Sequence, residues 1–143
     1  MESNVIQLER VFDAPVDVIW KALTDKTEMK KWYFDLEEFK PEVGFKFTFT
    51  GGPDCDTQFV HLCEITEVIP QKKLTYSWSY EGYSGMSHVT FELSPQDNKT
   101  LFRLTHTGID TFPKTNIHLD ISNFRAGWDD IINRSLKAYL EPQ

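Results

Sequence analysis

The hydrophobic residues of this chain follow two different periods, and each period predicts a different kind of element. Apolar and polar residues alternate near the N-terminus and again through the middle of the chain. Such alternation is typical of β-strands with one buried and one exposed face. The predicted strands are Val5–Phe12, Phe45–Thr50, Phe59–Ile69, Leu74–Glu81, His88–Leu93 and Leu101–His106.

A period near 3.6 residues predicts helices after the first strand and near the C-terminus. Pro15 suits the first position of a helix, because the N–H that it lacks would be unpaired there. Asp25 is expected to cap a second short helix that ends near Tyr33, with Glu28 as its reciprocal capping partner. The C-terminal helix is predicted from about Ser122 to Leu140, with apolar residues at spacings of three and four: Phe124, Trp128, Ile131, Ile132, Leu136 and Leu140.

Short turns between the strands predict an antiparallel meander, and its apolar face needs a cover. The C-terminal helix, about 28 Å long at 1.5 Å per residue, is that cover. Gly51-Gly52-Pro53-Asp54 is expected to break one strand, and Gly127 to let the helix approach a strand closely. Both faces of the segment from Phe59 to Val68 carry apolar residues, so the sequence does not decide which face points inward.

Composition and charge limit the classes of function. A chain of 143 residues that is 40% hydrophobic predicts one domain, residues 1–143, with a substantial core. The net charge of −7 repels phosphate backbones, so we predict no nucleic-acid partner. The chain begins without a basic and apolar leader, and no stretch approaches the roughly 18 apolar residues of a membrane span. We therefore expect a cytoplasmic protein with reduced thiols and no membrane insertion.

Motifs for metal binding and catalysis are weak or absent from the sequence. His61 and Cys63 share a strand face, and Cys55 and Asp56 precede them, but zinc sites normally have paired ligand spacings that are missing here. We predict no metal and no cofactor. The sequence contains no nucleophile elbow and no phosphate-binding loop. These absences favour a protein that is not an enzyme, although an enzyme acting on an apolar substrate needs only a shaped cavity and one or two polar groups.

Several groups of residues, in order along the chain, resemble a known family: Arg10–Pro15, Val18–Asp25 with Trp32, Glu67–Pro70, Leu74–Trp78 and Gly127-Trp128. Over about residues 5–140 the chain resembles the activators of the ninety-kilodalton heat-shock protein ATPase, within the START-like (SRPBCC) superfamily. The eukaryotic activators carry an additional N-terminal chaperone-binding domain, and this chain is similar only to their C-terminal domain. The resemblance therefore does not imply full ATPase activation.

The resemblance implies an α+β helix-grip fold, also called START-like or Bet v-like. In this fold a curved antiparallel sheet wraps around the long C-terminal helix, and two short helices after the first strand close one end. It also implies a cavity between sheet and helix, which superfamily members use for lipids, sterols, polyketides and other apolar molecules.

We predict that aromatic residues of the strands and of the last helix line such a cavity, although a solid core is the alternative for them. The predicted ligand-binding residues are Phe45, Phe47, Phe49, Tyr76, Trp78, Phe91, His106, Phe124, Trp128 and Ile131. His106 lies on the same face of its strand as Phe102 and Leu104, so it points inward if they do. It is then either a polar group of the cavity, as an anchor or general base, or a hydrogen-bonded core histidine.

Three classes of function follow. The first is binding of a small apolar molecule, lipid-like or polyketide-like. The second is a co-chaperone-like interaction domain whose partner is a heat-shock chaperone. The third is a cyclase or hydrolase that acts on an apolar substrate. We expect the first, because the aromatic alternation and the resemblance both favour it.

Overall fold

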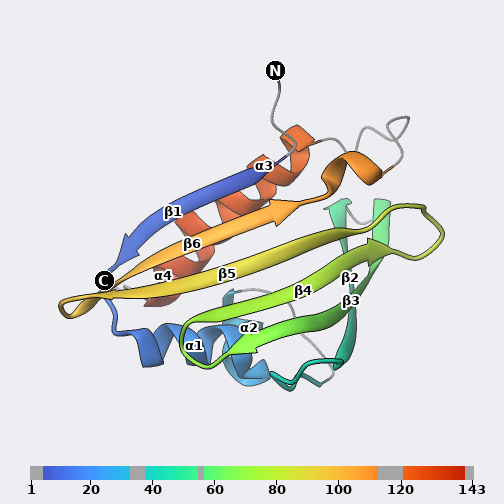
Figure 1. Cartoon of the computed structure of the whole chain (residues 1–143). Coiled ribbons are helices and arrows are strands. Elements are labelled where there is room, and N and C mark those ends of the chain that lie inside the picture. Colours follow the sequence, from blue (N-terminus) through green and yellow to red (C-terminus); the bar gives the residue numbers. More distant parts are fainter. Residues whose placement is uncertain (1–4, 33–37, 55–56, 113–120, 141–143) are drawn as a thin grey trace.

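The structure is a computed structural model that describes residues 5–32, 38–54, 57–112 and 121–140, with the backbone alone for 51–54, 57, 58, 122 and 123. Figure 1 shows the arrangement of its elements. In chain order they are β1 (Ile6–Phe12), α1 (Val16–Thr24), α2 (Lys26–Trp32), β2 (Lys46–Asp54), β3 (Thr57–Ile69), β4 (Lys73–Tyr80), β5 (Ser87–Gln96), β6 (Lys99–Thr107), the 3-10 turn η1 (Ile109–Thr111), α3 (Ile121–Asp130), the π-helical segment η3 (Ile131–Leu136) and α4 (Lys137–Leu140).

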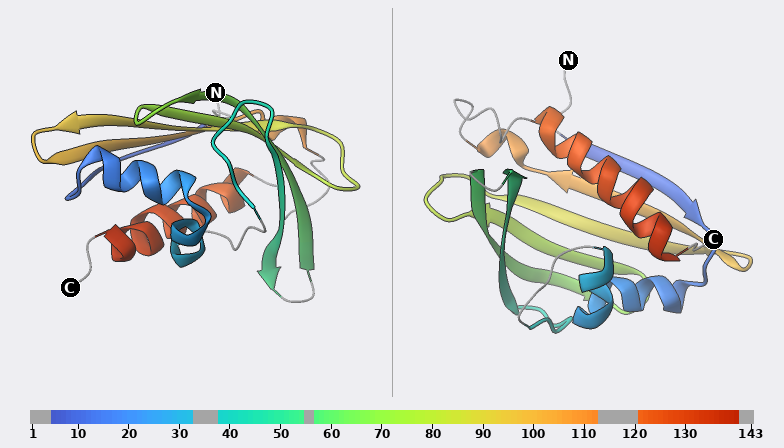
Figure 2. Two further views of the ribbon diagram at one scale, coloured as in Figure 1. Left: turned by 90° about the horizontal axis from the view of Figure 1, so that it is seen from below. Right: turned by 180° about the vertical axis from the view of Figure 1, so that it is seen from behind.

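The strands form one antiparallel sheet with the order β1-β6-β5-β4-β3-β2. Strands β2 to β6 pair with their neighbours in sequence, as the short turns predict. β1 instead pairs with the last strand, β6, so that β1 and β2 are the two edge strands. Figure 2 shows that the sheet curves and that α1, α2 and the C-terminal helix all lie on its concave side. The helix-grip architecture is therefore confirmed.

β3 changes face part-way along its length, which explains its ambiguous sequence. Ile65 pairs with Tyr76 but Glu67 pairs with Thr75, so Thr66 is the extra residue of a β-bulge. Before the bulge the buried side chains are at odd positions, namely Phe59, His61, Cys63 and Ile65. After it Val68, at an even position, packs against the core. One inserted residue exchanges the two faces of a strand, so both faces carry apolar residues.

The strand break predicted at Gly51-Gly52-Pro53-Asp54 is wrong. β2 runs on to Asp54, which pairs with Thr57 after an irregularity that follows Gly51. Proline lacks an N–H and is tolerated in a strand that has a partner on only one side. Because β2 is such an edge strand, this stretch remains part of the sheet.

The C-terminal helix predicted over residues 122–140 is present as α3, η3 and α4. Its buried side chains are four residues apart: Phe124, Trp128, Ile132 and Leu136. An α-helix has 3.6 residues per turn, so such a row drifts around the helix axis, and the wider turns of η3 reduce that drift. Ile132 is therefore buried, whereas Ile131 is half-buried and packs against the edge of the core.

Gly127 does not bring this helix closer to a strand, contrary to the expectation from the sequence. The residue is exposed, and a Cβ atom at this position would meet nothing within 4 Å. A glycine inside a helix costs about 0.5–1 kcal/mol relative to alanine. Here no close contact offsets that cost.

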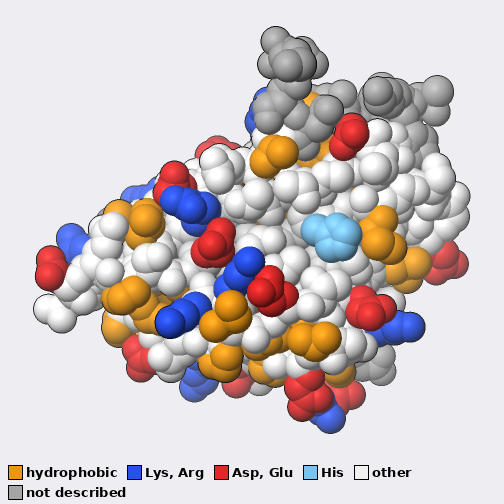
Figure 3. Space-filling view, viewed as in Figure 1, with side chains coloured by type: hydrophobic (Ala, Val, Ile, Leu, Met, Phe, Trp, Pro, Cys, Tyr) orange, Lys and Arg blue, Asp and Glu red, His pale blue; other side chains and the backbone are white. Residues whose placement is uncertain are grey.

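The convex face of the sheet is open to solvent. Figure 3 shows acidic, basic and hydrophobic side chains interspersed on this face. Its ion pairs include Arg103 with Glu9 at 3.0 Å and Lys73 with Glu67 at 3.1 Å. Exposed pairs of this kind contribute about 0–1 kcal/mol each, so the packing on the concave side holds the fold together. None of the described helices is long and apolar enough to cross a membrane.

Candidate functional site

The predicted ligand-binding residues lie together on the concave side, but in two different settings. Eight of them form one network of ring contacts: Phe47, Phe49, Tyr76, Trp78, Phe91, His106, Phe124 and Trp128. Phe45 and Phe47 lie at the β2 end of this network, and Ile131 lies at its edge on the helix. The two settings differ in whether they leave space for a ligand.

Around Trp128, at the centre of the concave face, aromatic rings are in direct contact with one another. The Trp128 ring centroid lies 5.7 Å from that of Trp78 and 6.0 Å from those of both Phe91 and His106. These are normal separations for aromatic rings in direct contact. Trp128 is 3% exposed. These contacts favour the solid-core alternative for this part of the face.

His106 is fully buried and joins three elements through its hydrogen bonds. The indole Nε1–H of Trp128 donates to His106 Nδ1 at 2.9 Å. An indole nitrogen can only donate, so Nδ1 is the acceptor and the ring proton lies on Nε2. Nε2 then donates to Ser87 Oγ at 2.7 Å, and the Ser87 hydroxyl donates to the carbonyl oxygen of Trp78 at 3.0 Å.

This chain of hydrogen bonds uses both ring nitrogens of His106. Burial, with a smaller contribution from the charge of His88, lowers the pKa of His106 to about 3. The imidazole is therefore neutral at pH 7 and has no lone pair left to accept a proton from a substrate. Ser87 is also fully buried, so the Ser87–His106 pair is closed to solvent. The geometry favours a core histidine over a general base.

His61 and Cys63 point inward from β3 and are both buried. His61 Nδ1 lies 3.2 Å from the carbonyl oxygen of Phe49 and 3.1 Å from that of Phe59, so Nδ1 carries the proton. Burial lowers the pKa of His61 to about 4 and raises the pKa of the Cys63 thiol. Residues 55 and 56, the other part of the metal site considered above, lie outside the described residues. Within the described residues no three potential ligands are grouped for a metal ion.

A pocket of about 680 Å³ lies at the β2 end of the concave side. Its described lining consists of Lys26 of α2, Glu38, Phe45 directly before β2, and the first three residues of β2, namely Lys46, Phe47 and Thr48. Because β2 is an edge strand, residues from both of its faces border the same space. Two aromatic rings and several charged or polar groups therefore share one pocket.

The pocket is continuous with the aromatic network behind it. Phe47 lies edge-on to Tyr76, with ring centroids 5.1 Å apart, and Phe39 packs edge-on against both Phe47 and Phe45 at 5.2 and 6.0 Å. Phe47 is buried, whereas Phe45 is only half-buried. Phe45 is thus the predicted aromatic residue that offers its ring most directly to a ligand.

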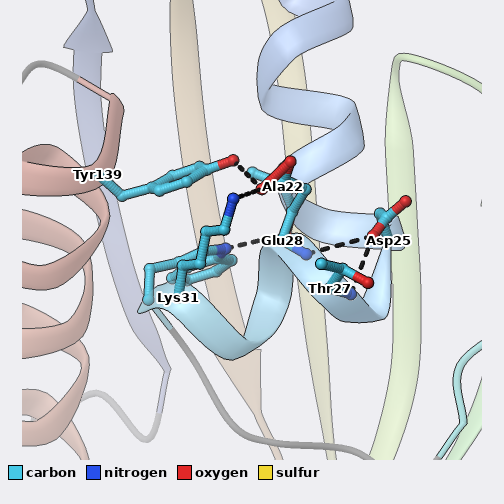
Figure 4. Close-up of polar contacts among 7 residues, drawn as sticks. Ala22, Asp25, Thr27, Glu28, Lys31 and Tyr139 are labelled. Carbon is cyan, nitrogen blue, oxygen red and sulfur yellow. Dashed lines mark hydrogen bonds and ion pairs between the residues drawn. The ribbon is translucent and has the colours of Figure 1, made fainter.

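The helix α2, which supplies one wall of the pocket, is tied to neighbouring elements (Figure 4). As expected, the Asp25 carboxylate caps it by accepting hydrogen bonds from the N–H groups of Thr27 and Glu28 at 2.9 and 3.2 Å. The Trp32 indole N–H donates to the carbonyl oxygen of Ala22 at 2.9 Å. These bonds fix α2 against α1.

The expected reciprocal capping bond from Glu28 is wrong, because the Asp25 N–H donates instead to the carbonyl oxygen of Lys21 at 2.9 Å. The Glu28 carboxylate has a tertiary partner. Tyr139 of α4 donates its hydroxyl to Glu28 at 2.6 Å, and Lys31 forms an ion pair with Glu28 at 3.0 Å. The hydrogen bond from Tyr139, followed by Lys31, lowers the pKa of Glu28. Burial and then the bond to Glu28 raise the pKa of Tyr139 to about 12. The contact, drawn in Figure 4, links α2 to the end of the C-terminal helix.

Reasoning from the sequence missed the polar residues of the pocket. Lys46 and Thr48 alternate with phenylalanines, so the period assigns them to a solvent face. The missing signal was the edge position of β2, which brings both faces of the strand to one space. Lys26 and Glu38 come from other parts of the chain, and only the tertiary fold brings them to this strand.

Comparisons with known proteins agree with the fold. The family model described as "Activator of Hsp90 ATPase homolog 1-like protein" matches residues 13–141. Among solved structures, the chain is similar to protein MLL2253 from Mesorhizobium loti, with 27% sequence identity and a TM-score of 0.79, over 96% of each chain. The comparison with curated proteins gives no match.

Two further solved structures are similar at lower identity and support the fold alone. DynU16, a protein in the dynemicin biosynthetic locus, is 23% identical with a TM-score of 0.79; the match covers 99% of this chain and 48% of that one. The chain therefore spans about half the length of DynU16. The Aha1 dimer from Colwellia psychrerythraea is 22% identical with a TM-score of 0.71, over 96% of each chain.

Proposed function

The chain belongs to the Activator of Hsp90 ATPase homolog 1-like protein family, and from this premise we propose that it binds a small apolar ligand, lipid-like or polyketide-like, on the concave side of its sheet. The observation that carries the proposal is the pocket of about 680 Å³ that Phe45 and Phe47 line. Small-molecule sites generally have volumes of about 300–1,000 Å³ and combine apolar walls with a few polar groups. The volume of this pocket lies in that range, and its described lining combines two phenylalanines with four polar or charged residues.

The free energy of binding would come chiefly from covering aromatic surface. Each Å² of apolar surface removed from water contributes about 25 cal/mol. Phe45 is half-buried, so part of its ring surface can still be covered. In this proposal Phe47, Phe49, Tyr76 and Trp78 form the apolar wall behind the ligand. The remaining predicted residues, Phe91, His106, Phe124, Trp128 and Ile131, hold the C-terminal helix against the sheet.

An amide-resolved NMR titration with a library of lipophilic small molecules tests this proposal. We expect saturable shift changes concentrated on Lys26 and on residues 45–48, with smaller changes around Trp78. Changes centred on Trp128 and His106 would mean that the packed centre opens and that the ligand lies against the helix instead. No saturable change with any compound would overturn the proposal.

A pair of variants makes the titration specific to the pocket. Phe45→Ala removes a half-buried ring from the lining and should weaken binding of any compound that shifts residues 45–48 in the wild-type protein. Val43→Ala is the matched control, because Val43 is 67% exposed, lies two residues away and is not among the described lining residues. Equal affinities in the two variants would contradict the assignment of Phe45.

The family match favours a second candidate, interaction with a heat-shock chaperone, because the family takes its description from ATPase activation. An ATPase assay with the chaperone of the same organism discriminates the two functions. Under our proposal the chain neither binds the chaperone nor stimulates its ATPase. Stimulation that survives Phe45→Ala would assign the function to the outer surface of the protein rather than to the pocket.

A further inference from the structure

We infer that His106 is a pH switch for the C-terminal helix: a proton added to His106 releases Trp128 and frees α3 from the sheet, while the sheet itself stays paired. The inference concerns the contact between α3 and β6, so it depends neither on the pocket at the β2 end nor on a ligand. It follows from the direction of the hydrogen bonds at the centre of the concave side.

The direction of the hydrogen-bond chain through His106 is fixed at both of its ends. The Trp128 indole N–H can only donate, and it donates to His106 Nδ1 at 2.9 Å. A backbone carbonyl can only accept, and that of Trp78 accepts from the Ser87 hydroxyl at 3.0 Å. His106 Nε2 donates to Ser87 Oγ at 2.7 Å and completes the chain. A second proton on the imidazole therefore has only Nδ1 to occupy.

A proton on Nδ1 cannot coexist with the bond from Trp128. The indole keeps its own proton, so two N–H groups would face each other across 2.9 Å. Both side chains are buried, so the charged imidazole reaches water only when Trp128 moves away. Burial, with a smaller effect of the charge of His88, lowers the pKa of His106 to about 3, which agrees with this exclusion.

The described surroundings of His106 provide no negative charge that would stabilise the imidazolium in place. The residues that pair with His106 in the sheet or contact its ring are apolar or aromatic: Ile6 of β1, Val89 of β5, Trp78 of β4, and Phe124 and Trp128 of α3. The charged residues of α3 are all exposed: Arg125, Asp129 and Asp130. Besides burial, the described group that shifts the pKa of His106 is His88 of β5, whose positive charge would oppose a second one.

The two parts of the C-terminal helix are attached to the protein in different ways. The first part, α3, lies on His106 through Phe124 and Trp128, with ring centroids at 5.4 and 6.0 Å from that of the imidazole. The second part, η3 and α4, is held by two side-chain hydrogen bonds of 2.6 Å, from Arg10 to Asn133 and from Tyr139 to Glu28. We therefore expect a proton on His106 to free α3 and to leave η3 and α4 in place.

The sheet and the second half of the helix should tolerate mild acid. The register of β6 with β1 and β5 is a matter of backbone groups, so it does not need the imidazole. The hydrogen bond from Tyr139, followed by Lys31, lowers the pKa of Glu28, so this carboxylate stays ionised and keeps its bond as the pH falls towards its ordinary value of 4.5. Release of α3 is thus a local opening rather than global unfolding.

Hydrogen exchange of the Trp128 indole N–H tests the switch, with His106→Gln as the reference. A glutamine can accept the bond from Trp128 and donate to Ser87, but it takes up no proton. Once α3 is released, His106 regains its ordinary pKa of 6.5. The ratio of the exchange rate in the wild-type protein to that in the variant should therefore rise about tenfold for each pH unit below 6.5. Comparing the two proteins at the same pH cancels the intrinsic pH dependence of indole exchange.

His61→Gln is the matched control, because it removes the other buried histidine and leaves His106 in place. The rise should persist in this variant. A constant ratio between pH 6 and pH 4.5 would overturn the inference, and so would an equal rise for the backbone amides of β4 and β5, which would indicate global unfolding.

A second measurement uses the wild-type protein alone and does not depend on the folding of a variant. As the pH is lowered, the backbone amides of α3 should lose protection from hydrogen exchange before those of β4 and α4. Simultaneous loss in all three elements would overturn the inference. None of these outcomes bears on the proposed function, because no ligand is present.

Discussion

The two ends of the aromatic network use the same sequence pattern for different purposes. At the centre, Trp78 and Phe91 alternate along their strands and are covered by Trp128 of the C-terminal helix. At the β2 end, Phe45 and Phe47 alternate in the same way but line a pocket. Both regions belong to one continuous set of rings.

The two regions differ in the side chains that lie opposite the strands rather than in the strands themselves. At the centre a tryptophan fills the space, and its N–H completes the hydrogen-bond chain through His106 and Ser87. At the other end Lys26 of α2 and Glu38 contribute to the walls, and they do not fill the volume. An aromatic strand face thus becomes a core or a binding surface according to the size of the side chains opposite.

The largest effect that distinguishes the two regions should come from Trp128→Ala. This change removes a buried ring and leaves His106 Nδ1 without its donor, so we expect the free energy of unfolding to fall by about 3–5 kcal/mol. Phe45→Ala should cost only about 1–1.5 kcal/mol, because that ring is half-buried. Urea unfolding measures both values. Equal losses would mean that the pocket end is packed as tightly as the centre.

The pH dependence of stability should report on the buried histidines. The pKa values of His106 and His61 are about 3 and about 4 in the folded protein, against 6.5 for an ordinary histidine. Above pH 6.5 these rings are neutral in both the folded and the unfolded protein. As the pH falls below 6.5 the unfolded chain takes up protons that the folded protein does not, so the free energy of unfolding decreases towards pH 4 and below.

The variant His106→Gln isolates the contribution of His106 to this pH dependence of the free energy of unfolding. Each pH unit below 6.5 costs about 1.4 kcal/mol for one such histidine. Between pH 6.5 and pH 5 the variant should therefore lose about 2 kcal/mol less than the wild-type protein, as measured by urea unfolding at each pH. Parallel curves would show that His106 takes up a proton in the folded state as readily as in the unfolded one.

A smaller and more local effect should follow from Tyr139→Phe at the pocket end. The variant keeps the ring but removes the hydroxyl that donates to Glu28. Hydrogen exchange of the α2 amides should become roughly two- to tenfold faster, as expected for the loss of one hydrogen bond. Amides in the packed strands β4 and β5 serve as the internal control. Unchanged exchange in α2 would mean that this bond does not brace the pocket wall.

The smallest expected effect is a gain in stability. Gly127→Ala places a methyl group in open space on the exposed side of the helix, so it should raise the free energy of unfolding by about 0.5–1 kcal/mol. It should leave ligand binding unchanged, because Gly127 is not among the described residues of the pocket. A loss of stability would mean that the helix does need glycine at this position.

Much of the fold followed from local patterns. The alternation of Phe45, Phe47 and Phe49 with polar residues identified β2, and the spacing of Phe124, Trp128 and Leu136 identified the buried side of the C-terminal helix. The capping role of Asp25 was also visible in the sequence. Such features depend on neighbouring residues alone, so one chain is enough to reveal them.

The errors arose where distant segments decide the outcome. Glu28 satisfied a local capping pattern, yet its carboxylate bonds to Tyr139, more than a hundred residues away along the chain. The break expected at residues 51–54 did not occur because β2 has a partner on one side only. The face of β3 was undecided because the bulge at Thr66 depends on its pairing with β4.

By itself, the sequence determined the order of the elements and the set of aromatic residues that leave water, because hydrophobic periodicity is a local property of the chain. The helix-grip fold class came from the resemblance of its motifs to a known family. Only the tertiary structure decided which of these residues pack solidly and which line a pocket. That division depends on the side chains opposite each strand, and here they belong to segments separated by tens of residues. The same reason explains why Lys26 and Lys46, which belong to different elements, both line one pocket in the folded protein.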